Sequence, residues 1–175
     1  MNSYQTISNV VHGRRFTGEV SLEKQKNQKE QVVFAISGYK NSGKTTLTVK
    51  LVERLTQMGY RVATIKHDGH DFEPDVPGTD SYRHRKAGAY GSAVFSGNRW
   101  MVTKEQPMDL EEKKIDEQDL MQMFPEADII LLEGFKQSSW PKYFCRYPEE
   151  IPDEEEALSR ILSCLQLIKE RVGSK

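Results

Sequence analysis

The sequence predicts an α/β fold with a mostly parallel twisted sheet, helices on both faces and an added β-hairpin. Two short apolar runs, at residues 32–37 and 128–133, have the nearly continuous pattern of parallel strands that are buried on both faces. A third strand candidate, Tyr60–Lys66, alternates in polarity. Between the first and third candidates lies an amphipathic helix that ends at Gly59, and its stripe is Leu47, Leu51, Leu55 and Met58. Strand, helix and strand in this order indicate a right-handed parallel crossover.

The rest of the chain supplies shorter elements. We expect a short helix at Asp80–Ala87, two strands joined by a tight hairpin around residues 96–98, and a helix within residues 115–124 that ends before a proline. A shorter strand is expected within residues 142–147. The chain then closes with an amphipathic helix over residues 152–173, whose acidic start is typical of a capped, solvated helix end.

Residues 1–30 are polar and have no sustained period. We expect a flexible polar N-terminal arm there, with at most a short strand near Thr6–Val11. A chain of 175 residues favours one domain, which we place at residues 31–175.

Composition excludes several classes of protein. The net charge of −1 gives no argument for nucleic acid or a membrane as a partner. No apolar run approaches the ~20 residues that cross a bilayer, and the polar N-terminus lacks the apolar core of a signal peptide. Cys145 and Cys164 form no CxxC pair, so we expect free thiols in a reducing cytoplasm.

One sequence motif indicates which kind of ligand the protein binds. Residues 38–45 match G-x-x-x-x-G-K-[ST] in full, between a predicted strand and a predicted helix. Glycines let backbone N–H groups turn toward phosphate oxygens, and the helix start adds its positive end. A chance glycine-rich turn is the alternative, but the flanks favour a P-loop NTPase domain. The expected nucleotide-binding residues are Gly38, Tyr39, Lys40, Asn41, Ser42, Gly43, Lys44, Thr45 and Thr46.

A P-loop holds Mg²⁺ through its Ser/Thr hydroxyl and an acid at the end of another strand. Thr45 supplies the hydroxyl, and Glu133 ends the second buried run. Ligands of parallel sheets gather at the carboxyl ends of strands, which favours Glu133. Asp68, at the exit of Tyr60–Lys66, is the second candidate, and a merely solvated carboxylate is the alternative for either acid.

Two basic groups could bind a second anion. Arg83, Arg85 and Lys86 lie on the expected short helix, and Lys136 follows the second buried strand. Forked guanidinium groups suit phosphate, although a solvated basic face explains the same pattern. The base of the nucleotide is not indicated, because no Asn-Lys-x-Asp motif follows a late strand. No activating glutamine or arginine finger is evident either, so fast hydrolysis is not expected.

Four separated segments, GYKNSGKTTL, TIKHDGHDF, GTDSYRHRKAGA and LLEGFK, occur in an order and spacing that resemble the molybdopterin-guanine dinucleotide biosynthesis protein B (MobB) family. The resemblance covers residues 33–143. It implies a GTP- and Mg²⁺-binding, weakly hydrolysing homodimer of the deviant Walker kind. Such a protein assists the molybdenum cofactor guanylyltransferase that joins GMP to molybdopterin. One departure is Tyr39, which stands where related dimeric ATPases carry a signature lysine.

The resemblance also implies a groove for molybdopterin or its guanine dinucleotide. The matching positions are Lys66, His67, Asp80, Ser81, Arg83, Arg85, Lys86, Gly134 and Lys136.

Two other functions stay open from the residues. A small-molecule or nucleoside kinase would use arginines of a lid, and the expected short helix offers Arg83 and Arg85 without a long lid insertion. A metallochaperone GTPase would carry His-rich or Cys-containing metal motifs, for which Cys145 and Cys164 are unsuitably placed.

Overall fold

The computed structural model describes residues 5–11, 14–20, 30–69, 72–105 and 115–173. Its centre is a four-stranded sheet in the order β4-β7-β3-β8, and all three neighbouring pairs are parallel. The strands are β3 (Val32–Gly38), β4 (Val62–Lys66), β7 (Ile129–Glu133) and β8 (Lys142–Cys145). The expected strand–helix–strand unit is present, but β7 lies between β3 and β4.

The two apolar runs of the sequence occupy the middle of this sheet. Every residue of β7 is buried, and β3 is buried at every position except Val33. This is the pattern of strands covered on both faces, and it confirms the predicted α/β class.

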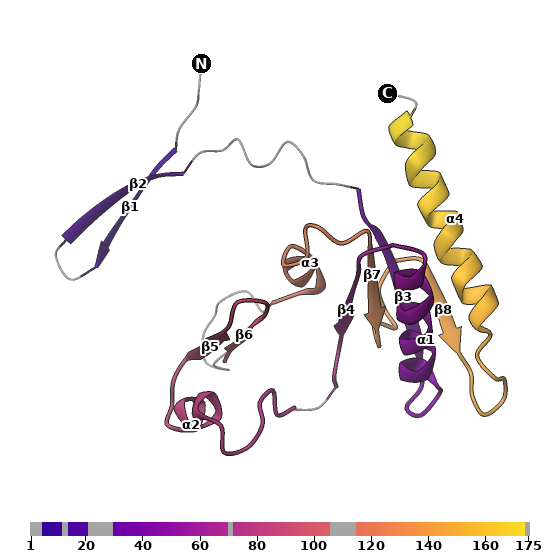
Figure 1. The fold of residues 1–175 in the computed structure, drawn as a ribbon, viewed down its shortest axis with the longest axis horizontal. Coiled ribbons are helices and arrows are strands. Elements are labelled where there is room, and N and C mark those ends of the chain that lie inside the picture. The colour runs from indigo at the N-terminus through magenta and orange to yellow at the C-terminus, as the bar shows by residue number, and fades with distance from the viewer. Residues whose placement is uncertain (1–4, 12–13, 21–29, 70–71, 106–114, 174–175) are drawn as a thin grey trace.

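Helices cover both faces of the sheet. On one face α1 (Lys44–Gln57) and α4 (Glu154–Gly173) pack side by side (Figure 1). Leu51 and Leu55 of α1 are fully buried there with Ile161 of α4, and each such side chain contributes about 1.5–3 kcal/mol of transfer free energy. On the other face α3 (Glu117–Met121) places Met121 against Ile130 and other sheet residues.

The predicted stripe of α1 is right for its leucines and wrong for Met58. Leu47, Leu51 and Leu55 are buried, whereas Met58 is half exposed. The helix ends at Gln57, and Gly59 takes a left-handed φ of 88° just beyond it, so the chain has already turned away from the core at Met58.

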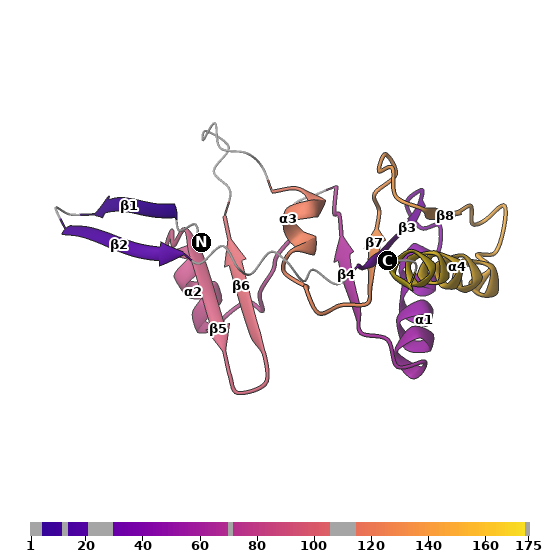
Figure 2. The same ribbon diagram turned by 90° about the horizontal axis from the view of Figure 1, so that it is seen from above.

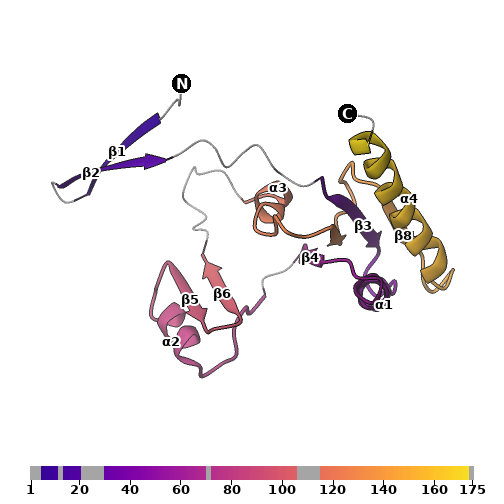
Figure 3. The same cartoon turned by 45° about the horizontal axis from the view of Figure 1, so that its top comes forward.

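A smaller group of elements lies apart from the central sheet (Figures 1 and 3). It comprises α2 (Asp80–Lys86) and the antiparallel strands β5 (Gly91–Phe95) and β6 (Trp100–Lys104). The Ser96 N–H donates to the Arg99 carbonyl at 2.8 Å and closes the predicted hairpin. Thr79 caps α2 by accepting the N–H of Tyr82.

The N-terminal segment contains a second hairpin, β1 (Gln5–Val11) with β2 (Arg14–Val20), visible in Figure 2. The sequence predicts at most one short strand here. The division into an arm at residues 1–30 and a domain at residues 31–175 stays a prediction, and residues 1–4, 12–13 and 21–29 of that arm lie outside the described ranges. A helix suited to crossing a membrane is not found among the described residues, since α4, the longest, carries charges along its length.

Candidate nucleotide-binding site

The phosphate loop connects the carboxyl end of β3 to the first turn of α1. Gly38 ends β3 with a φ of 148°, and a Cβ there would lie 2.5 Å from the carbonyl oxygen of Cys145. Only glycine fits this close approach of β3 to β8. The loop ends at Gly43, which precedes the first turn of α1. The positive end of α1 therefore begins where the loop closes.

The polar groups of the loop indicate an anionic ligand. Lys44 Nζ donates to the carbonyl oxygen of Tyr39, at the opposite end of the loop. The Ser42 hydroxyl is buried and has no hydrogen-bond partner among the described residues. A buried hydroxyl without a partner is costly unless a ligand or water satisfies it. The loop thus carries an ammonium group and an orphan hydroxyl where phosphate oxygens are expected.

Glu133 is the acid that the structure joins to the loop. Its side chain is only 6% exposed, and its Oε1 accepts a hydrogen bond from Thr45 Oγ1 at 2.7 Å. Parallel pairing aligns Glu133 with Ile36 of β3 and Lys66 of β4, at the carboxyl edge of the sheet. A hydroxyl and a carboxylate at this distance are the pair from which P-loop proteins bind Mg²⁺.

Asp68, the other candidate acid, lies beyond β4 and pairs with Lys66, with Oδ2 3.7 Å from Nζ. Both residues follow or end the strand that neighbours β7. The two acids therefore share one edge of the sheet, and Glu133 is the one that accepts the hydrogen bond from Thr45.

Other predicted ligand residues gather at the same edge. The ring of His67 packs edge-on against Phe135 with centroids 5.6 Å apart, and a Cβ on Gly134 would lie 2.9 Å from the His67 carbonyl oxygen. Lys136 Nζ lies 4.6 Å from the ring centroid of Tyr39. Tyr39 stands at the position where the signature lysine is missing. Its ring contacts a different lysine, Lys136, which follows β7.

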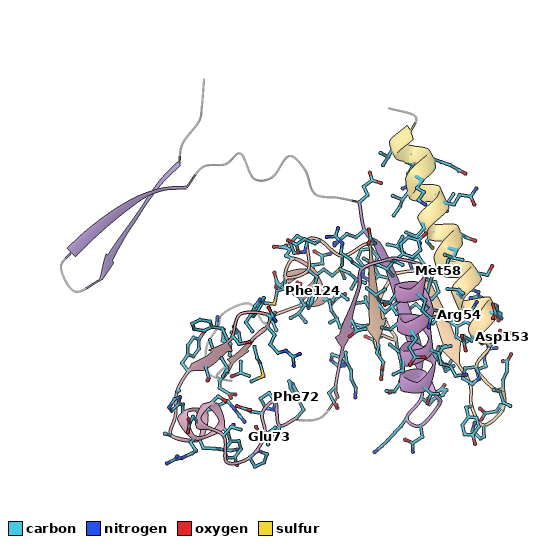
Figure 4. All side chains as sticks on the ribbon, viewed as in Figure 1. Arg54, Met58, Phe72, Glu73, Phe124 and Asp153 are labelled. Carbon is cyan, nitrogen blue, oxygen red and sulfur yellow. The ribbon has the colours of Figure 1, made fainter. Side chains whose placement is uncertain are left out.

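The α2 residues have partners within their own part of the fold. The Arg85 side chain is 11% exposed and is ion-paired with Glu73 and Glu105, and Glu73 also pairs with Lys86 at 3.4 Å. Figure 4 places Glu73 beside α2.

The start of α2 is organised in the same local way. A hydrogen bond from the Ser81 hydroxyl is the main cause of a lowered pKa at Asp75. Asp80 lies 3.8 Å from Arg83, whose side chain is largely exposed. The structure therefore does not bring these residues to the phosphate loop, and their contact with a ligand stays a prediction.

Cys145 lies under the loop, beside Gly38 in the β3–β8 register. Burial raises the pKa of its thiol, against the opposing effect of the Lys44 charge. A neutral thiol adds no negative charge beneath the phosphate loop.

A cavity of about 620 Å³ opens over the loop. Its polar lining comes from the loop together with Lys50, Lys66 and Glu133. Three lining residues, Tyr147, Ile151 and Pro152, come from the connection between β8 and α4 and were not expected at the site. The sequence contains one indication of these three residues, because they follow the strand that is expected within residues 142–147. Only the observed strand order, however, places that strand, β8, beside β3.

The comparison with known families decides the relationship. Residues 33–160 match the family model described as MobB, molybdopterin guanine dinucleotide synthesis protein B. The chain belongs to the MobB family.

Curated relatives agree with the family match. The chain is 40% identical over 112 residues to the molybdopterin-guanine dinucleotide biosynthesis adapter protein of Escherichia coli K12, covering 63% of this chain and 62% of that protein. For the adapter protein of the same name from Haemophilus influenzae the identity is 38%, with 63% and 60% covered. The chain thus spans about three fifths of the length of these relatives.

A solved relative supports the fold. The crystal structure of Bacillus subtilis MobB superimposes with a TM-score of 0.52 at 30% identity, covering 66% of this chain and 68% of that one. The family match includes the phosphate loop, Glu133, α2 and the connection from β8 to α4, and it leaves out the N-terminal hairpin.

Proposed function

We propose that this protein binds GTP-Mg²⁺ on the phosphate loop and acts as an adapter in molybdenum cofactor biosynthesis, where it assists the attachment of GMP to molybdopterin. The observation that carries the nucleotide site is the Thr45–Glu133 hydrogen bond of 2.7 Å, made at the mouth of a complete phosphate loop. The pathway rests on membership of the MobB family and on relatives that are named as adapter proteins.

Several groups of the phosphate loop have a role in the proposed nucleotide site. Backbone N–H groups and Lys44 bind the β- and γ-phosphates, and the Ser42 hydroxyl gains an oxygen acceptor. Thr45 and Glu133 hold Mg²⁺, and Asp68 reaches it through water. Among the described residues that line the cavity there is neither glutamine nor arginine, which favours slow hydrolysis. A slow GTPase suits an adapter better than a turnover enzyme.

The second ligand is molybdopterin or its guanine dinucleotide. We assign its anionic end to Lys66, His67, Gly134 and Lys136, because they lie at the same sheet edge as the phosphate loop. The α2 residues Asp80, Ser81, Arg83, Arg85 and Lys86 belong to this proposal by family resemblance alone. The partner enzyme is the guanylyltransferase, and two free thiols favour a cytoplasmic location.

We also propose a homodimer that forms through the hairpin β5–β6. Phe95 and Trp100, which are paired in its register, are 85% and 68% exposed, and Val102, two residues from Trp100 on the same face of the hairpin, extends the apolar surface. Contiguous apolar surface of this kind marks an interaction site. A second copy of the chain is the occupant, because a twofold axis pairs one such patch with another. The double variant Phe95→Ser/Trp100→Ser should sediment as a monomer where the wild type sediments as a dimer. A dimeric variant would refute this interface.

Calorimetry with GTP-Mg²⁺ and ATP-Mg²⁺ tests the nucleotide site. We expect the wild type to prefer GTP and Lys44→Ala to bind neither nucleotide, because the phosphates lose their ammonium partner. Lys169→Ala, an exposed lysine of α4, is the matched control and should bind as the wild type does. Unchanged GTP affinity in Lys44→Ala would overturn the assignment. A preference for ATP would favour a P-loop kinase instead.

A further inference from the structure

We propose that the connection between β8 and α4, residues 146–152, holds the purine base of the bound nucleotide, with Tyr147 as the stacking platform and Ile151 and Pro152 beside it. The inference rests on the proposed nucleotide site and adds to it the part of the ligand that the phosphate loop does not touch.

Each end of the connection lies against one glycine of the phosphate loop. Its first neighbour, Cys145, pairs with Gly38 in the β3–β8 register. Its last residue, Pro152, has Cγ 3.1 Å from the place of a Cβ on Gly43. The segment therefore starts against one end of the phosphate loop and finishes against the other, and whatever the loop binds must lie next to it.

The far end of the connection is anchored to the rest of the domain. The Asp153 N–H donates to the Tyr143 hydroxyl at 2.8 Å, which ties the start of α4 to β8. Glu154 pairs with Lys50 at 3.3 Å and with Arg54 at 3.4 Å, both on α1. Figure 4 shows Arg54 on α1 and Asp153 at the foot of α4. A segment held in this way is preorganised to receive a flat ring.

The side chains that line the cavity are of two kinds. The loop and its neighbours supply the ammonium groups of Lys40, Lys44, Lys50 and Lys66, whereas the connection supplies Tyr147, Ile151 and Pro152. Tyr147 is 52% exposed and Ile151 is 80% exposed. Single exposed apolar residues are ordinary, but three that share one cavity with four lysines match a ligand with an anionic end and an aromatic end.

Charge assigns the two ends of the ligand. Glu149 and Glu150 lie in the chain between Tyr147 and Ile151, and Glu150 Oε2 is 3.5 Å from Arg146 Nη1. None of these charged side chains lines the cavity, so the connection brings no cation to it, and we place the phosphates against the lysines and the base against the connection. Stacking holds the ring of a base through its π-face and does not require an Asn-Lys-x-Asp motif.

The test separates the base from the phosphates. Calorimetry in Mg²⁺ compares GTP with inorganic tripolyphosphate on the wild type, Tyr147→Ala and Tyr147→Phe. We expect Tyr147→Ala to weaken GTP by about 5- to 150-fold, the equivalent of ~1–3 kcal/mol of stacking, and to leave tripolyphosphate unchanged. Tyr147→Phe keeps the ring and should bind GTP as the wild type does. Leu167→Ala on α4, where Leu167 is 56% exposed, is the matched control for truncating an exposed apolar side chain.

Each other outcome decides against the inference. Unchanged GTP affinity in Tyr147→Ala, or a wild type that binds GTP no better than tripolyphosphate, overturns the base site and leaves the phosphate site standing. Equal weakening of both ligands also overturns it, because the connection would then support the phosphate loop. Binding of neither ligand by the wild type overturns the proposed nucleotide site and the base site with it.

Discussion

The replacement Gly38→Ala tests the contact on which the site is built. A Cβ at Gly38 would lie 2.5 Å from the carbonyl oxygen of Cys145 and 2.4 Å from Ser42 Oγ, both buried, at a φ of 148°. The backbone conformation costs about 1–3 kcal/mol for alanine, and overpacking a dense site costs about 1–3 kcal/mol more. We therefore expect Gly38→Ala to lower the free energy of unfolding by about 2–6 kcal/mol.

Gly59→Ala is the matched control for this prediction. Gly59 also has a positive φ, of 88°, but no atom of the described residues lies within 4 Å of its Cβ position. Only the left-handed conformation is then penalised, at about 1–2 kcal/mol. Urea unfolding of both variants at one temperature gives the two free energies, provided that the m-values agree with the wild type.

The two variants together test whether β3 and β8 approach each other closely at Gly38. Because β3 and β8 must separate to admit the new methyl group, Gly38→Ala should also lose nucleotide affinity while it is still folded, and Gly59→Ala should keep it. Equal destabilisation by the two substitutions would refute the close approach of β3 to β8. So would full nucleotide affinity in Gly38→Ala.

Three further predictions follow from the same geometry. Glu133→Gln should weaken Mg²⁺-dependent GTP binding about tenfold or more, because it removes a metal-binding charge but keeps an acceptor for Thr45; titrations with and without Mg²⁺ measure this. Arg85→Ala should cost about 1–3 kcal/mol in thermal unfolding, since it leaves Glu73 and Glu105 without their arginine, while removal of an exposed arginine costs under about 0.5 kcal/mol. Burial raises the pKa of Cys145, so its thiol should react with a maleimide more slowly than the half-buried Cys164 between pH 7 and pH 8.

Each of these three predictions has its own control and its own contradicting result. Glu53→Gln, on the exposed side of α1, should leave the Mg²⁺ dependence unchanged, and a Glu133→Gln protein with wild-type dependence would remove that residue from the metal. Arg83, with a side chain that is 74% exposed, supplies the comparison for Arg85, and equal losses would contradict a structural role. For the thiols, mass spectrometry of the labelled peptides distinguishes the two sites, and faster labelling of Cys145 would contradict its burial.

Most of the central fold is predictable from the sequence because its signals are local. The buried runs of β3 and β7, the leucine stripe of α1 and the turn at residues 96–98 each depend on neighbours in the chain, and the structure confirms all four. Met58 is the exception, since the helix end at Gln57 moves it off the stripe.

The neighbours of each strand are not local and could not be predicted. The insertion of β7 between β3 and β4 is decided by which apolar faces pack together, and no short pattern records that choice. This strand order brings Glu133 to Thr45. The sequence predicts that Glu133 lies at the site, because ligands of parallel sheets gather at the carboxyl ends of strands. The partners of Arg85, in contrast, are acids from a loop and from the hairpin, which the sequence does not connect.

By itself, the sequence determined the phosphate loop, its flanking strand and helix, and the family to which they belong, because a contiguous motif carries its own geometry. The tertiary structure alone decided that β8 runs beside β3 and so delivers Tyr147, Ile151 and Pro152 to the same cavity. The physical reason is that sheet order arises from packing between segments far apart in the chain, and a site built across such an order has no local pattern of its own.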